Sequence, residues 1–163
     1  MLAMARQEEE SKRLGGRLLG LLGKLQRNAT PRDVSTEGIE LGTVRAKMLL
    51  NNIAANTSLM CLAMTRKLSD DEIGVDMARM LMVNKSIRKL ELEGNKFGPK
   101  TAREFGYLLQ INKNLKFIDF ENNMLTNNGD DPSGLFSFIE ALKTNKTLLS
   151  LNMANNCLDD AIG

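Results

Sequence analysis

The chain has 163 residues, of which 42% are apolar and 26% charged, and its formal net charge is +2. This is ordinary globular composition, and no apolar run approaches the roughly 20 residues that a membrane span needs. The low aromatic content and small net charge argue against a nucleic-acid partner. The chain has no histidine and two distant cysteines, Cys61 and Cys157, which excludes the common nucleophile–base pairs, histidine metal sites and disulfide frameworks. We therefore expect a protein that is not an enzyme and uses no cofactor or metal.

Residues 1–27 carry the net positive charge, with six basic groups against three glutamates, whereas residues 28–163 hold 16 basic and 17 acidic groups. The stretch 11–27 has leucines on one helical face and is amphipathic. Its four glycines weaken an isolated helix, so we expect it to need a partner. Docking into a protein assembly is our favoured interpretation, ahead of a membrane-surface helix and a mitochondrial targeting helix, which the glutamates at 8–10 disfavour. The predicted docking residues are Leu14, Arg17, Leu18, Leu21, Leu22 and Leu25.

Turn-forming residues dominate the next stretch, 27–38, which predicts a linker or an irregular cap. We accordingly divide the chain into an N-terminal arm with its linker, residues 1–36, and a second domain, residues 37–163.

The second domain contains internal repeats. Segments 56–69, 84–97, 112–125 and 145–158 align without gaps, and their first asparagines are spaced 28, 28 and 33 residues apart. The last three follow the pattern L-x-x-L-x-L-x-x-N-x-L, whereas the first has Lys67 in place of the asparagine. Each segment is preceded by a helix-period stretch with two apolar residues four positions apart, on one helical face. These pairs are Leu49 with Ile53, Met77 with Leu81, Phe105 with Leu109, and Phe138 with Leu142.

This strand–turn–helix unit resembles the leucine-rich repeat family in its ribonuclease-inhibitor-like form. The resemblance implies an α/β solenoid of about four repeats, with parallel strands on the concave face and helices on the convex face. Asn95, Asn123 and Asn156 are expected to bond buried backbone groups where each strand ends. Asn56, Asn84 and Asn145 are expected at helix ends, with positive φ.

Acidic pairs precede the expected helices, at 70–72, 130–131 and 159–160, where carboxylates cap backbone N–H groups. The insertion that lengthens one repeat, 127–134, is polar and turn-forming, so we expect a loop that could contact a partner. The last residues, 158–163, match 68–74, where a repeat helix begins. We expect either that the natural chain continues past Gly163 or that something else covers this edge of the solenoid.

The outward positions of the strands predict a binding surface on the concave face. Four carboxylates on adjacent strands lie beside an exposed aromatic residue and should repel one another unless they are screened or engaged. Two interpretations remain open: a solvated face, or a docking surface for a basic peptide or helix, with Phe117 as its main anchor. The predicted partner-binding residues are Lys89, Glu91, Glu93, Phe117, Asp119 and Glu121.

The run NTSLMCLAMTRKLSDDEIGVDMARMLMVNKSIRKLELEGNKF, residues 56–97, is similar to the C-terminal repeat domain of tropomodulin and leiomodin. There too a repeat opens with Asn-Thr and a helix runs into a Met-Leu-x-Val-Asn-Lys turn. The resemblance covers roughly residues 40–163 and implies a cytoskeletal module that caps or nucleates actin filaments. It assigns an actin contact to no individual residue of this sequence.

Together these observations predict a non-enzymatic protein–protein interaction module, an accessory or scaffold subunit of a large cytoskeletal or axonemal assembly. The alternatives are a tropomodulin-like actin filament regulator, a GTPase-activating protein on the same fold, and a peripheral membrane protein anchored by residues 11–27. We expect protein partners such as actin or axonemal components, no nucleic acid, and a membrane surface only as the lesser alternative. The expected location is cytoplasmic and cytoskeleton-associated, with an organellar assembly as the alternative.

Overall fold

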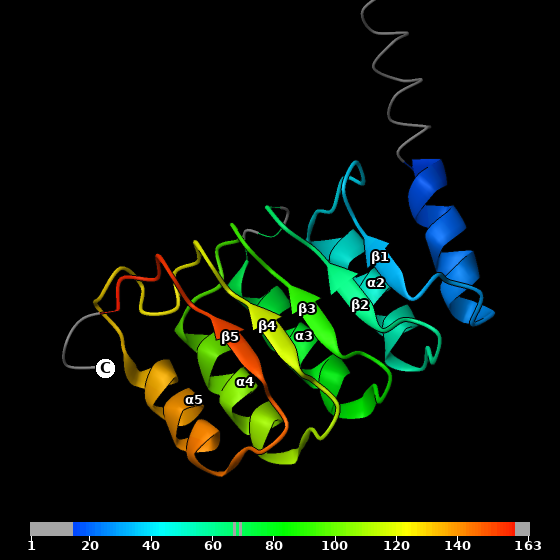
Figure 1. The fold of residues 1–163 in the computed structure, drawn as a ribbon. Coiled ribbons are helices and arrows are strands. Elements are labelled where there is room, and N and C mark those ends of the chain that lie inside the picture. Colours follow the sequence, from blue (N-terminus) through cyan, green and yellow to red (C-terminus); the bar gives the residue numbers. More distant parts are fainter. Residues whose placement is uncertain (1–14, 67, 69, 159–163) are drawn as a thin grey trace, which may run out of the picture.

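The computed structural model describes residues 15–66, 68 and 70–158. Its strands form one parallel sheet in chain order, and its helices cover one face of that sheet, so the molecule is an arc of strand–helix units (Figure 1). The strands are β1 (Asp33–Ser35), β2 (Cys61–Ala63), β3 (Lys89–Glu91), β4 (Phe117–Asp119) and β5 (Ser150–Asn152). The helices are α2 (Thr43–Ala54), α3 (Asp71–Val83), α4 (Pro99–Ile111) and α5 (Ser133–Thr144), preceded by an N-terminal helix over residues 15–26.

The core lies between the sheet and the helices, because each strand directs its middle residue inward. Leu62, Leu90 and Ile118 are buried at these positions. Farther along the solenoid, Phe120 lies edge-to-face against Phe105, with ring centroids 4.8 Å apart, and against Phe138, at 6.3 Å. The repeat pattern therefore becomes one continuous apolar layer, as predicted.

The asparagines at the strand ends are buried and bond backbone groups, which confirms the predicted ladder. Asn123 shows the pattern: its amide nitrogen donates to the carbonyls of Leu92 (2.9 Å) and Phe120 (3.0 Å), and its oxygen accepts from the N–H of Phe97 (3.1 Å). Each such side chain joins two repeats and satisfies polar groups that burial would otherwise leave unpaired. Lys67, in the equivalent place of the first segment, lies outside the described residues.

The asparagines that follow the helices do not have the predicted positive φ. Asn84 and Asn145 have φ of −65° and −69°, in extended backbone. Their recurrence has another cause, since each side-chain amide donates to a carbonyl in the helix of the preceding repeat, as Asn84, which follows α3, does to Ile53 of α2 at 2.8 Å. Asn56 makes the same bond to Leu25 at 2.9 Å, so the N-terminal helix is held in the same way as the repeat helices.

The N-terminal region is therefore part of the solenoid, which corrects two predictions. Leu18, Leu22 and Leu25 are buried in the chain's own core, with Leu21 packed against it, so these leucines are not free to dock on a partner. Arg17 is exposed and donates to the Gly38 carbonyl at 3.5 Å, whereas Leu14 lies outside the described residues. The expected linker over 27–38 contains β1, which pairs with β2.

Local signals around the helices agree with prediction where the structure describes them. Asp70 caps α3 by accepting the N–H of Glu72 at 3.0 Å, and Asp131 accepts the N–H of Ser133 at 3.0 Å. Residues 127–130 form an exposed turn, in which Asn127, Asn128 and Gly129 have positive φ. Residues 159–160, the third expected cap, lie outside the described residues. Among the helices of the described chain, none is both long and apolar enough to cross a bilayer.

The inward residue of the last strand of the sheet is covered less completely than those of the inner strands. Leu90 and Ile118 are almost completely buried, whereas Leu151, which occupies the same position in β5, is only half-buried. Leu148 and Met153 share this partial burial. The inner side of β5 is thus incompletely covered by the described residues.

Candidate protein-binding face

The solvent-facing side of the sheet brings the predicted binding residues together. In the strand register, Lys89 lies between Cys61 and Phe117, and Glu91 lies between Ala63 and Asp119. Glu93 and Glu121 follow the ends of β3 and β4, where the N–H of Gly94 bonds the carbonyl of Glu121 at 2.9 Å. All six predicted residues therefore lie on one surface, which we call the concave patch.

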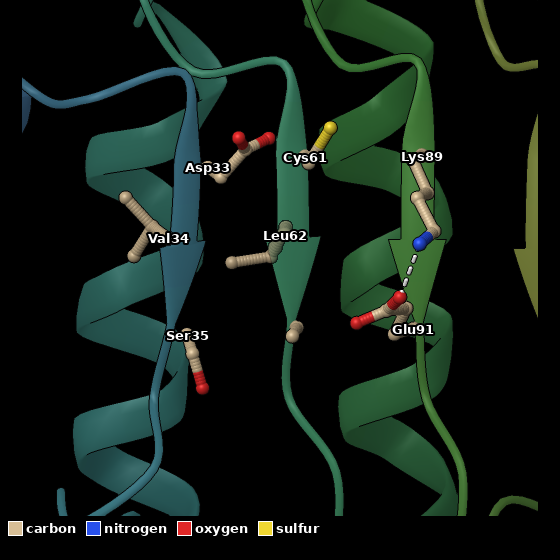
Figure 2. Close-up of a pocket in the computed structure, with 8 residues that line it drawn as sticks. Asp33, Val34, Ser35, Cys61, Leu62, Lys89 and Glu91 are labelled. Atoms are coloured by element: carbon tan, nitrogen blue, oxygen red, sulfur yellow. Dashed lines mark ion pairs between the residues drawn. The ribbon is translucent and has the colours of Figure 1, made fainter.

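The carboxylates of the concave patch are partly neutralised, so the expected repulsion is reduced. Lys89 forms an ion pair with Glu91, drawn in Figure 2, and this contact raises the pKa of Lys89. Arg66 was not predicted to lie here. Its Nη2 atom lies 2.6 Å from Oε1 of Glu93. Asp119 and Glu121 have no described basic partner; they accept hydrogen bonds from the N–H of Glu121 (2.8 Å) and from Asn152 (3.0 Å). The face keeps an acidic excess on β4.

Phe117 is the large apolar side chain of this polar surface. Its side chain is 42% exposed, and its neighbours in the register are Lys89 and Ser150. An exposed aromatic ring with polar neighbours is a typical anchor of protein interfaces, because a partner can bury it fully. The geometry is that of a binding surface with one apolar anchor and a charged rim.

A shallow hollow of about 400 Å³ lies beside the concave patch, over β1, β2 and β3 (Figure 2). Asp33 and Ser35 from β1 line it together with Cys61, Lys89 and Glu91. The β1 residues were not predicted, because turn-forming residues dominate their segment and indicate a linker. A signal was available, since Asn28 precedes Asn56 by the same 28 residues that separate the next two repeats.

No protein-family model matches the chain. Among solved structures, a leiomodin-1 domain described as actin-binding site 2 superimposes with a TM-score of 0.70 at 23% identity, over 82% of this chain and 77% of that one. The tropomodulin C-terminal domain of Caenorhabditis elegans also gives 0.70, at 12% identity, over 84% and 82% of the two chains. The fold is a leucine-rich repeat solenoid. The likeness that residues 56–97 predicted is thus confirmed at the level of the fold.

The solenoid's hollow holds a thiol that is poorly suited to nucleophilic chemistry. Burial, followed by hydrogen bonding to Asp33, raises the pKa of Cys61 to about 11. The side chain is therefore protonated at neutral pH, and the neutral thiol is a weak nucleophile. In the part of the chain that the structure describes, no group of three or more His, Cys, Asp or Glu side chains could hold a metal ion.

Proposed function

We propose that the chain is a protein–protein interaction module of the actin cytoskeleton, without catalytic activity, and that it binds its partner through the concave patch. The observation that carries the proposal is the register of β3 and β4, which puts exposed Phe117 beside Lys89 and Glu91 beside Asp119. The inner face of a repeat solenoid is its usual binding surface. The leiomodin-1 domain of the same fold is described as an actin-binding site, which supports actin as the first partner to test.

The partner segment should be basic and should carry an apolar side chain. Five acidic side chains lie over β1, β3 and β4 and their ends, against two basic ones, Arg66 and Lys89. A segment with lysine or arginine next to an aliphatic residue would meet the acidic groups of β4 and cover Phe117 at once. The acidic side chains are Asp33, Glu91, Glu93, Asp119 and Glu121.

Co-sedimentation with actin filaments tests this proposal. Two variants of the concave patch, Phe117→Ala and the charge reversal Glu91→Lys with Asp119→Lys, should each weaken binding at least tenfold, since hot-spot residues contribute about 2 kcal/mol or more. The matched control, Glu40→Lys with Glu140→Lys, makes the same charge change at exposed sites away from this face. Its affinity should stay within about twofold. Absence of wild-type binding, or full binding by both patch variants, would refute the proposal.

A second candidate is an accessory or scaffold subunit of a larger assembly, and the half-buried inner side of β5 favours it. Leu148, Leu151 and Met153 would be fully covered if another subunit packed on this strand. Affinity purification of the tagged chain from its native cells, followed by mass spectrometry, should then recover a stoichiometric set of partners. Recovery of a folded, monodisperse chain alone would contradict the scaffold role and leave the actin test unaffected.

A further inference from the structure

The solenoid separates its charges between the two edges of the arc. The five loops that lead from a helix to the next strand lie along the lower edge in Figure 1 and comprise residues 27–32, 55–60, 84–88, 112–116 and 145–149. These loops contain seven basic residues and no acidic residue. We call the seven the basic edge: Arg27, Arg32, Lys85, Arg88, Lys113, Lys116 and Lys146.

The opposite edge has the reverse composition. The loops that lead from a strand to the next helix, residues 36–42, 64–70, 92–98 and 120–132, contain seven acidic and three basic residues. Formal charges of +7 and −4 on the two edges partly cancel, to +3. The near-neutral body of the sequence therefore conceals a strongly polarised molecule.

The charges of the basic edge are not neutralised by carboxylates. None of the seven side chains forms an ion pair with another described residue. Two of them bond carbonyls at helix ends, Lys85 to Met82 at 2.7 Å and Lys113 to Gln110 at 3.3 Å. Those acceptors carry no formal charge, so the ammonium groups keep theirs, with only partial compensation from the helix dipole.

Exposed aliphatic side chains are interspersed with these charges. Val83 and Ile111, the last residues of α3 and α4, are 64% and 57% exposed, and Leu149 is 69% exposed. Each lies within three positions of a lysine of the basic edge, namely Lys85, Lys113 or Lys146. The same combination recurs in successive repeats, so it extends along the edge.

We propose that the basic edge binds the surface of an anionic lipid bilayer. Successive repeats contribute to the edge at a spacing set by the strands, about 4.8 Å, so several basic side chains can meet a flat surface together. Lysine and arginine are attracted to anionic headgroups, and single aliphatic side chains between them can enter the headgroup region. The membrane contact differs from the one expected for residues 11–27, in which Leu18, Leu22 and Leu25 are buried in the chain's own core. It leaves the concave patch free for a protein partner.

Vesicle co-sedimentation at low ionic strength tests the proposal on the full chain, with phosphatidylcholine vesicles and phosphatidylcholine–phosphatidylserine vesicles as probes. The wild-type chain should bind only the vesicles with phosphatidylserine, and added salt should release it. The variant Lys85→Glu, Lys113→Glu, Lys146→Glu should weaken binding at least 100-fold, since each charge near the surface is worth about fivefold. Replacing the same three lysines by glutamine should give a smaller loss.

The matched control is Lys47→Glu, Lys96→Glu, Lys100→Glu, which changes the net charge equally at exposed positions outside the basic edge. It should bind within about threefold of wild type, and thermal melting should show that every variant is folded. Equal losses in both triple variants, or no wild-type binding to phosphatidylserine, would overturn the proposal. Binding of soluble polyglutamate without binding of vesicles would also overturn it and identify an acidic protein as the ligand.

Discussion

Helices α3 and α4 are joined through one carboxylate, whereas α4 and α5 contact each other through backbone. Asp71 at the start of α3 accepts the N–H groups of Gly98 (2.7 Å), Lys100 (3.1 Å) and Thr101 (3.0 Å), and so caps the next helix. At the α4–α5 junction, the carbonyl group of Pro99, the first residue of α4, faces Gly134 of α5. A Cβ added to Gly134 of α5 would lie 2.0 Å from the Pro99 carbonyl oxygen.

The two junctions should tolerate change differently. A carboxylate that spans two helices can be replaced by another acceptor, because the space around it already holds a side chain. A glycine against a carbonyl leaves no room for any side chain, and the backbone cannot move without displacing a whole helix. A Cβ on Gly74 of α3 would also be crowded, at 1.9 Å from Thr101, but there the opposing atom belongs to a side chain, whereas at Gly134 it belongs to the backbone.

The largest expected effect is that of Gly134→Ala, which would break the α4–α5 contact. The added methyl group should lower the free energy of unfolding by about 3 kcal/mol, the upper part of the range for overpacked cores. Urea unfolding followed by circular dichroism measures it. The control is Gly20→Ala, where nothing lies within 4 Å of the added Cβ; that change should leave stability unchanged or raise it by up to about 1 kcal/mol. An unchanged midpoint for Gly134→Ala would contradict the close approach.

Asp71→Ala should break the α3–α4 contact at a smaller cost, about 2 kcal/mol, because three N–H groups of α4 and its entry lose their acceptor. The conservative change Asp71→Asn keeps one oxygen and should lose less than half as much. Asp70→Ala, which removes the α3 cap alone, should cost about 1 kcal/mol. If the Asp70 and Asp71 variants were equally stable, Asp71 would not act as a bridge between the helices.

The contrast between these junctions also shows what the sequence could predict. The repeat spacing was enough to predict the parallel sheet, the buried leucines and the asparagines that bond backbone groups at the strand ends, because each repeat presents the same residues at the same offsets. The caps at Asp70 and Asp131 follow from local rules. The role of Asp71 does not, since its acceptor function depends on the position of a helix that starts 28 residues later.

The N-terminal region and the charges show the other limits. Thr36 replaces a leucine of the repeat pattern, and β1 has few apolar residues. The strand propensity of this segment was therefore too weak to predict a strand. The 28-residue spacing from Asn28 to Asn56 was the remaining signal. The concave patch was predicted from the alternation of inward and outward residues along the strands. Arg66 was not predicted, because it lies in a turn after β2, with a positive φ of 54°, where this alternation no longer holds. The basic edge was missed because summing charge along the chain averages the two kinds of loop.

A third variant tests whether the α3–α4 junction depends on its exposed ion pair as well as on Asp71. The Nζ atom of Lys100 lies 2.5 Å from Oε1 of Glu72, and the two side chains are 64% and 52% exposed. This contact raises the pKa of Lys100. Exposed pairs contribute little, so Lys100→Ala should change the free energy of unfolding by less than about 0.5 kcal/mol. A loss as large as that of Asp71→Ala would mean that the junction depends on charge and not on capping.

The smallest expected effect concerns the start of α5, which uses a carboxylate of its own. Hydrogen bonds from the Ser133 side chain and N–H hold the pKa of Asp131 below its usual value. Because the folded state favours the charged form, the stabilisation is complete above the usual value and is lost as the pH falls through the lowered pKa. Carboxyl NMR titration should place the midpoint below 3.8, and Ser133→Ala should raise it. An unchanged midpoint in that variant would mean that the Ser133 side chain does not contribute to the cap. Since Gly134 and Pro99 are untouched, the α4–α5 contact should survive acid that weakens this cap.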